Sequence, residues 1–337
     1  MTTHFNLVQE VTNWDEHDLS RDDRLESLQA GETQAKQRKH EAAAERYCPS
    51  PDLLNAINAA LVTRTPLLIT GEAGTGKTQV AWFLARYFQV KLFEYQVHSN
   101  SQAKDMRYDF DAVAYLGDAY LAQHRDKEHN QETGKTDDPR SSPRYLKKGV
   151  LWKAYEQTEP CVLLIDEVDK APRDFPNDLL QELDQNRFAH PFNRNENDQP
   201  EEVNCDSAPP IIILTSNGER RLPDAFLRRC MVHQIKLDKN LLQAILSSWE
   251  GQFPVVNTQE QQADLQQEAL NIFNQIHSLS LSKPPGTAEL LLWISVLSAQ
   301  GTTAEALKHP IPALACLIKD SGDYSQVMDF YEQRAST

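Results

Sequence analysis

The chain has 337 residues, of which 40% are hydrophobic, and 49 acidic side chains against 34 basic ones give a net charge of −15. This length is sufficient for two domains with hydrophobic cores. The apolar runs are too short for a membrane span, and the acidity argues against a protein that mainly binds nucleic-acid backbones. The N-terminus lacks the basic start and long apolar middle of a secretory signal, so we expect a cytoplasmic protein.

The cysteines are scattered and form no Cys-x-x-C pair and no Cys/His spacing typical of zinc sites. We therefore expect them to be reduced and structural. They are Cys48, Cys161, Cys205, Cys230 and Cys316.

Residues 1–45 are highly charged and have little apolar periodicity. We expect a charged arm that is either a solvated helix or disordered, and a docking arm for a partner is the more specific reading. A helix is predicted over residues 53–61, with proline at its start. Tyr47 lies just ahead of a glycine-rich loop and is a candidate for the wall of a base pocket. Ordinary packing of Tyr47 is the alternative.

Residues 66–78, PLLITGEAGTGKT, place glycines between a short apolar strand and a helical pattern. Gly71, Gly76, Lys77 and Thr78 match the phosphate-loop motif G-x-x-x-x-G-K-[ST]. Glycines let backbone N–H groups surround a polyphosphate, and the following helix N-terminus adds partial positive charge. We expect Lys77 to contact the β- and γ-phosphates and the Thr78 hydroxyl to bind Mg²⁺. The predicted loop comprises Gly71, Glu72, Ala73, Gly74, Thr75, Gly76, Lys77 and Thr78.

A second strand is predicted over residues 91–98, where apolar and polar residues alternate. A long polar segment follows at about residues 123–148, dense in charged residues and proline. Such a length without predicted structure is unusual inside a compact domain and is typically functional or mobile.

Residues 161–170, CVLLIDEVDK, predict a fully buried strand that ends in carboxylates. Parallel sheets have such apolar strands, and open α/β sheets bind ligands at the carboxyl ends of the strands. We expect Asp166 to hold Mg²⁺ through water and Glu167 to orient and polarise an attacking water. A strand that ends in acidic residues is common, so this prediction depends on the phosphate loop upstream.

A further strand, residues 211–214, ends in Thr-Ser-Asn, and the Asn217 amide is predicted to hold the water or the γ-phosphate; a helix cap is the alternative. A helix over residues 175–186 and a polar loop over residues 193–207 precede this strand. Arg228 and Arg229 precede a fifth strand at residues 231–237. Three interpretations of these arginines are open. They belong to a solvated face, they form a structural ion pair, or they stabilise transition-state charge in a neighbouring subunit.

From residue 238 onward the apolar pattern becomes helical, which predicts a small all-α second domain. The expected helices cover residues 241–249, 263–279, 288–297, 310–318 and 324–332. The predicted domains are therefore an arm at residues 1–45, a core at residues 46–237 and a helical lid at residues 238–337.

These motifs, in this order, resemble those of the AAA+ ATPases and, within them, the MoxR-like family over roughly residues 47–300. The stretches that carry the resemblance are RTPLLITGEAGTGKT, VLLIDEVDKAPRDFPNDLLQEL, IIILTSNGERRLPDAFLRRC and KPPGTAELLLWISVL. The resemblance implies a five-stranded parallel αβα core with a helical lid. It also implies ATP and Mg²⁺ at the subunit interfaces of a ring, usually hexameric.

The resemblance also assigns roles to single residues. Asp166 takes the metal role, Glu167 the catalytic base and Asn217 the sensor 1 position. The arginine finger falls on Arg229, with Arg228 as second choice.

One departure concerns the start of the lid helix, where related proteins often carry the sensor 2 arginine. Here the matching position is Ala288, and Lys283 is close in sequence without occupying that position. Either sensor 2 is absent or another residue supplies the charge.

The resemblance favours an ATP-hydrolysing machine that remodels or assembles a protein partner, expected to be a protein with a von Willebrand factor A domain. A nucleotide-dependent switch or scaffold in a defence or signalling complex is the second hypothesis. A DNA-handling ATPase is the third, although the acidity and the lack of a helix-turn-helix or zinc module argue against it. A small-molecule kinase fits less well, because the paired arginines and the lid have no obvious use there.

Overall fold

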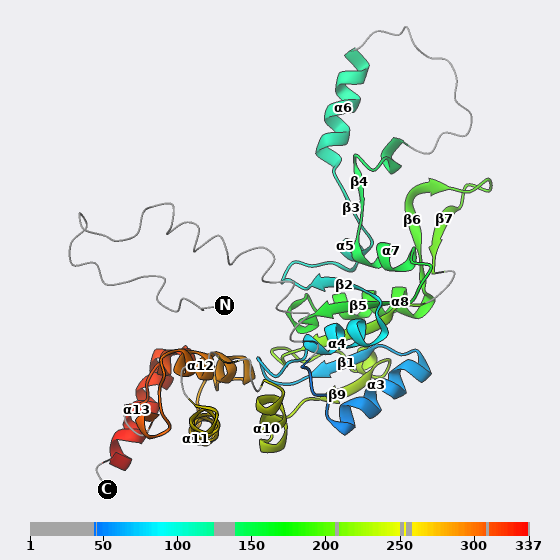
Figure 1. Cartoon of the computed structure of the whole chain (residues 1–337). Coiled ribbons are helices and arrows are strands. Elements are labelled where there is room, and N and C mark those ends of the chain that lie inside the picture. Colours follow the sequence, from blue (N-terminus) through cyan, green and yellow to red (C-terminus); the bar gives the residue numbers. More distant parts are fainter. Residues whose placement is uncertain are drawn as a thin grey trace. The chain divides into compact units, whose positions relative to one another are not determined.

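The computed structural model describes residues 44, 46–124, 139–205, 209–249, 253, 258–307 and 310–335 (Figure 1). The predicted arm at residues 1–45, apart from Ala44, and most of the polar segment at residues 123–148 therefore lie outside the described residues. The chain divides into two compact units. One, here called the core unit, contains Pro51–Gly71 and Ala81–Gln234. The other, the lid unit, contains Met1–Ser50, Glu72–Val80 and Ile235–Thr337.

The core unit is built on a five-stranded, all-parallel sheet in the order β2-β5-β8-β1-β9. Its inner strand β5 is apolar from Cys161 to Ile165 because both of its faces are covered, and these residues are almost fully buried. The α/β fold class predicted from the sequence is confirmed. The strands are β1 (Leu67–Thr70), β2 (Lys91–Gln96), β5 (Cys161–Asp166), β8 (Ile211–Ser216) and β9 (Met231–Gln234).

Helices flank this sheet, and their apolar side chains form its core. Leu163 and Leu214 of the sheet share one cluster with Trp152 of α7, Leu179 of α8 and Phe226 of α9. Full burial of each such side chain stabilises the fold by about 1.5–3 kcal/mol. The helices of this unit are α3 (Pro51–Thr63), α4 (Gln79–Phe88, whose first two residues belong to the lid unit), α5 (Ala103–Arg107), α6 (Ala112–His124), α7 (Val150–Tyr155), α8 (Phe175–Gln185) and α9 (Asp224–Leu227).

Two antiparallel strand pairs are additions that the sequence patterns did not predict (Figure 1). Strand β3 (Tyr108–Phe110) pairs with β4 (Leu146–Lys148), which falls within the segment predicted to be polar and unstructured. Strand β6 (Arg187–Arg194) pairs with β7 (Pro200–Asn204), so the predicted loop at residues 193–207 is partly a hairpin. Most residues of β7 are exposed, so its sequence lacks the buried alternation that identifies a strand.

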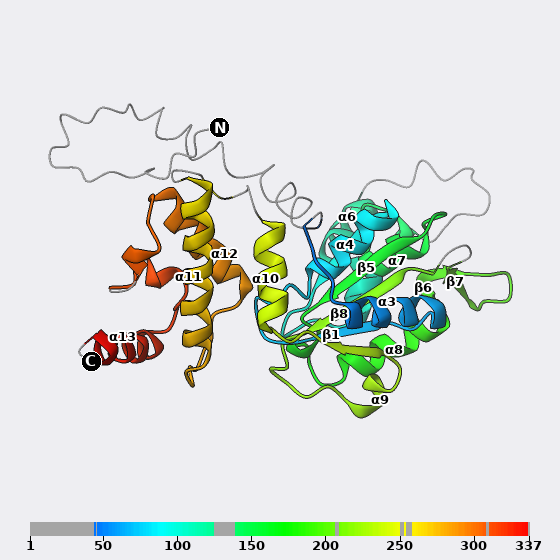
Figure 2. The ribbon, with the colours of Figure 1, turned by 60° about the horizontal axis from the view of Figure 1, so that its bottom comes forward.

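The lid unit contains α10 (Lys239–Ser248), α11 (Gln259–His277), α12 (Thr287–Ala299) and α13 (Ser321–Ala335), and α11 packs against α12 (Figure 2). Its core includes the fully buried Phe273 and Trp293. The predicted helix over residues 310–318 is wrong: only a short 3-10 turn, Leu314–Cys316, forms there. Proline residues ahead of that turn lack the N–H that a helix requires.

None of the helices in the described part of the chain combines the length and the apolar composition needed to cross a membrane.

Candidate nucleotide-binding site

The predicted functional residues of the core unit meet at one edge of its sheet. Strand β8 lies between β5 and β1, and Thr70 at the end of β1 is in register with Ser216 of β8. Because all of these strands are parallel, their carboxyl ends share one edge. Asp166 ends β5, Asn217 follows β8, and the glycine-rich loop begins directly after β1.

Thr215 links the Asp166 carboxylate at the end of β5 to the backbone of the next residue, Glu167. Its hydroxyl donates to Asp166 Oδ1 at 2.5 Å and accepts the backbone N–H of Glu167 at 2.8 Å. Glu167 has φ 59° and ψ 49°, a left-handed conformation that costs a non-glycine residue about 1–2 kcal/mol. Thr215 is fully buried, and its two hydrogen bonds are partly buried. Thr215 is not among the residues predicted from the sequence, although a threonine at the end of a buried strand next to the Asp-Glu strand indicates such a contact.

The Glu167 carboxylate is held by side chains from three directions. Asn217 Nδ2 donates to Oε1 at 3.0 Å, which brings together the two residues predicted as base and sensor. Gln96 Nε2 donates to Oε2 at 2.5 Å from the end of β2, where it is in register with Asp166. Lys170 Nζ also donates to Oε2, at 2.6 Å. The sequence analysis predicted neither Gln96 nor Lys170.

The charge of Lys170 is coupled to that of Glu167. Its hydrogen bond to the Glu167 carboxylate raises the pKa of the Lys170 ammonium, so this lysine remains protonated at neutral pH. A carboxylate with two oxygens accepts about four hydrogen bonds, so the contacts to Lys170, Gln96 and Asn217 orient it without using its full capacity.

Asp169 fixes the loop that carries Asn217. Its buried carboxylate accepts the backbone N–H of Glu219 at 2.8 Å and that of Asn217 at 3.3 Å. Charge-assisted hydrogen bonds of this kind are stronger than neutral ones. Asn217 is therefore held through its backbone as well as through its amide.

We expect Thr215→Val to reduce both stability and turnover. Valine keeps the shape of threonine but leaves the Glu167 N–H without its acceptor, at a cost of about 1–3 kcal/mol. The resulting shift of Glu167 should lower ATP turnover about tenfold to a hundredfold. Thermal unfolding and phosphate-release assays measure the two effects. Thr215→Ser, which keeps the hydroxyl, is the matched control, and a valine variant equal to wild type in both assays would exclude this role.

Residues 72–78 of the glycine-rich loop belong to the lid unit. Gly74 (φ 75°) and Gly76 (φ 83°) lie in the left-handed region that favours glycine. The carbonyl oxygen of Glu72 accepts a hydrogen bond from the Lys77 ammonium at 2.6 Å and another from the Thr75 hydroxyl at 2.8 Å. Lys77 is only 6% exposed, so the ammonium lies inside the curve of the loop. Helix α4 starts directly after Thr78.

Tyr47 packs on this loop. Its ring carbon Cε2 lies 3.4 Å from the position that a Cβ on Gly76 would take. Burial, with a smaller contribution from Cys48, raises the pKa of the Tyr47 phenol, which therefore stays neutral. The structure thus places Tyr47 against the predicted phosphate loop, and its contact with a base remains a prediction.

The two candidate arginine fingers are both exposed and lie directly after α9. The Arg229 guanidinium donates to the Ala225 carbonyl at 3.3 Å. Ala288 is the second residue of α12, and it is also exposed.

The residues predicted for magnesium, Thr78 and Asp166, supply a hydroxyl and a carboxylate oxygen, the ligand types that this ion prefers. Asp166 also accepts the Thr215 hydrogen bond, which orients its carboxylate. Among the described residues, no group of three or more His, Cys, Asp or Glu side chains is arranged to hold a metal ion.

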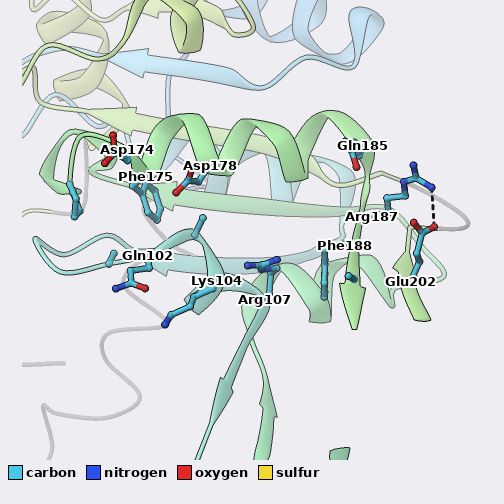
Figure 3. Close-up of a pocket in the computed structure, with 14 residues that line it drawn as sticks. Gln102, Lys104, Arg107, Asp174, Phe175, Asp178, Gln185, Arg187, Phe188 and Glu202 are labelled. Atoms are coloured by element: carbon cyan, nitrogen blue, oxygen red, sulfur yellow. Dashed lines mark hydrogen bonds and ion pairs between the residues drawn. The ribbon is translucent and has the colours of Figure 1, made fainter. Parts of the chain in front are cut away.

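A separate pocket of about 740 Å³ opens between α5, α8 and the β6–β7 hairpin (Figure 3). Phe175 and Phe188 line it, and Arg187 pairs with Glu202 at 2.9 Å. Its three basic side chains face three acidic ones, so the lining carries no net charge to attract a polyphosphate. The charged side chains are Lys104, Arg107, Arg187, Asp174, Asp178 and Glu202.

Residues 66–230 match the model of the family described as AAA domain (dynein-related subfamily). Among solved structures, the chain is similar to NtrX from Brucella abortus in complex with ADP, with 13% identity and a TM-score of 0.45 over 94% of this chain and 68% of the other. It is also similar to a "putative ATPase" from Cytophaga hutchinsonii, with 13% identity and a TM-score of 0.38 over 92% of this chain and 97% of the other. No curated protein matches the chain.

The family match covers the strands β1, β2, β5 and β8 and both predicted motifs, and it ends just before β9. The match therefore shows that residues 66–230 are similar to an AAA domain, in agreement with their parallel α/β sheet, and the helices of the lid unit follow in the chain.

Proposed function

We propose that the chain is an ATPase that couples hydrolysis to the remodelling or assembly of a protein partner. The observation that carries this proposal is the position of Glu167 at the carboxyl edge of the sheet. Asn217 donates to its carboxylate at 3.0 Å, and its backbone N–H is bonded to Thr215, which in turn donates to Asp166. A carboxylate held beside an amide in this way suits a base that orients an attacking water.

In the proposed reaction, the backbone N–H groups of the loop and the Lys77 ammonium bind the phosphates. Lys77 exchanges its bond to the Glu72 carbonyl for one to a phosphate oxygen. Glu167 accepts a proton from the attacking water, and the Asn217 amide orients the water or the γ-phosphate. Magnesium, held by Thr78 and through water by Asp166, would neutralise charge on the phosphates.

A kinetic assay tests this function. The purified chain should release phosphate from ATP in the presence of Mg²⁺ and not from ATP with a chelator. Binding of ATP without measurable turnover, even with the partner present, would instead support a nucleotide-dependent switch or scaffold. Two observations favour that second function, namely the salt bridge that Lys170 forms with Glu167 and the alanine at position 288.

We further propose a ring, hexameric by resemblance, in which each site borrows Arg229 from a neighbour. The exposure of Arg229 supports this role, because a finger has to reach another subunit. Mixing Arg229→Ala subunits with Lys77→Ala subunits should restore part of the activity, since one site type in the mixed ring is intact. Mixing Arg228→Ala subunits with Lys77→Ala subunits in the same way tests Arg228 as the alternative arginine finger. Absence of rescue at every ratio would argue against shared sites.

The MoxR-like assignment, a partner with a von Willebrand factor A domain and a cytoplasmic location belong to the same proposal. Glu167→Gln chains that hold ATP should capture the partner and allow its identification. The third hypothesis, a DNA-handling ATPase, predicts a DNA affinity that falls steeply with salt.

A further inference from the structure

The first turn of α12 lies directly on the glycine-rich loop, and both belong to the lid unit. The Thr287 N–H donates to the Gly74 carbonyl at 3.1 Å. A Cβ on Gly286 would stand 2.6 Å from the Ala73 carbonyl oxygen, so only glycine permits this approach. The backbone of the loop is therefore in contact with the lid helix.

This contact brings a carboxylate onto the loop. Glu289 Oε2 accepts the Gly286 N–H at 3.1 Å, which closes the N-terminus of α12. The same oxygen lies 3.2 Å from the position that a Cβ on Gly74 would take. Glu289 is half-buried, so solvent screens its charge only in part. The neighbouring Ala288 carries no charge that would offset it.

We infer that Glu289 determines nucleotide specificity by repelling the phosphate chain, and that it lowers the affinity for ATP more than that for ADP or AMP. The inference rests on the proposed function, because it requires phosphates to bind at this loop. Like charges within several ångströms repel, and the repulsion grows with each phosphate charge. In this reading the lid weakens the binding of triphosphate, whereas a cation at the same place would strengthen it.

Calorimetric titration of the full chain with ATP, ADP and AMP tests the inference. Glu289→Gln keeps an oxygen that accepts the Gly286 N–H and removes only the charge. It should tighten ATP binding about three- to tenfold, ADP binding less, and AMP binding hardly at all. The gain should shrink at high salt. Glu260→Gln is the control, because Glu260 is likewise a carboxylate in the first turn of a lid-unit helix, although it is exposed.

Glu289→Lys extends the series, and the ATP affinity should rise in the order Glu, Gln, Lys. Thermal unfolding without nucleotide checks that the variants keep the fold. Unchanged or weaker ATP binding in both variants, or equal gains for ATP and AMP, would overturn the inference. If the wild-type chain binds ATP and the Glu289 variants bind it no more tightly, this inference alone is rejected. If the wild-type chain binds no nucleotide, the proposed function is rejected.

Discussion

Glu167→Gln should stop ATP turnover while leaving ATP binding intact. Glutamine has the same size and still reaches Asn217, but it cannot accept a proton from the attacking water. Loss of a general base typically lowers kcat about 10²–10⁴-fold. The Glu167 side chain is 25% exposed and its salt bridge with Lys170 is partly solvated, so the fold should tolerate the change. Phosphate release measures turnover, and calorimetry measures binding.

The control for this variant is Glu202→Gln, which removes a carboxylate from the exposed pair with Arg187 on the β6–β7 hairpin. Surface pairs of this kind contribute about 0–1 kcal/mol, so turnover should be unchanged. Wild-type turnover in Glu167→Gln would remove Glu167 from its proposed role. Loss of ATP binding in that variant would instead assign Glu167 to the binding of the nucleotide.

Lys77→Ala should strongly weaken nucleotide binding. Its ammonium is the buried cation inside the loop, where it donates to the Glu72 carbonyl. Removal of one partner from a buried charge pair typically costs about 2–5 kcal/mol, which corresponds to a loss of about thirtyfold to several-thousandfold in affinity. The loss should be larger for ATP than for AMP, because the ammonium contacts phosphates. Calorimetry with both nucleotides measures it.

Lys239→Ala is a suitable control, because Lys239 is an exposed lysine at the start of α10. Lys77→Arg should give an intermediate affinity, since it keeps the charge but not the compact geometry of the ammonium. Equal affinities for ATP in wild type and Lys77→Ala would show that the phosphates bind elsewhere.

The inner strands of the sheet, β1, β5 and β8, could be predicted from the sequence because they are short apolar runs with clear ends. Residues 161–165 form one such run, and burial on both faces requires this composition. The same rule placed Asp166, Glu167 and Asn217 at neighbouring strand ends, where the structure brings them together. The glycine-rich loop was recognisable because its chemistry tolerates few other residue types.

The parts that the sequence did not reveal depend on contacts between distant segments. Gln96 reaches Glu167 only because β2 pairs with β5, and strand order cannot be read from a single strand. The hairpin of β6 and β7 is held by backbone hydrogen bonds between mostly exposed residues, which leave little apolar signal. Glu289 gives no signal in the sequence, because only the folded contact between α12 and the loop brings its carboxylate beside Gly74.

Hydrogen–deuterium exchange of the Glu167→Gln chain, with and without Mg·ATP, tests the central claim most directly. The claim is that one triphosphate contacts the phosphate loop and the ends of β5 and β8. ATP should therefore slow exchange in three separate stretches, residues 71–78, 166–170 and 215–219. Protection of the loop alone, or of none of these stretches, would contradict it.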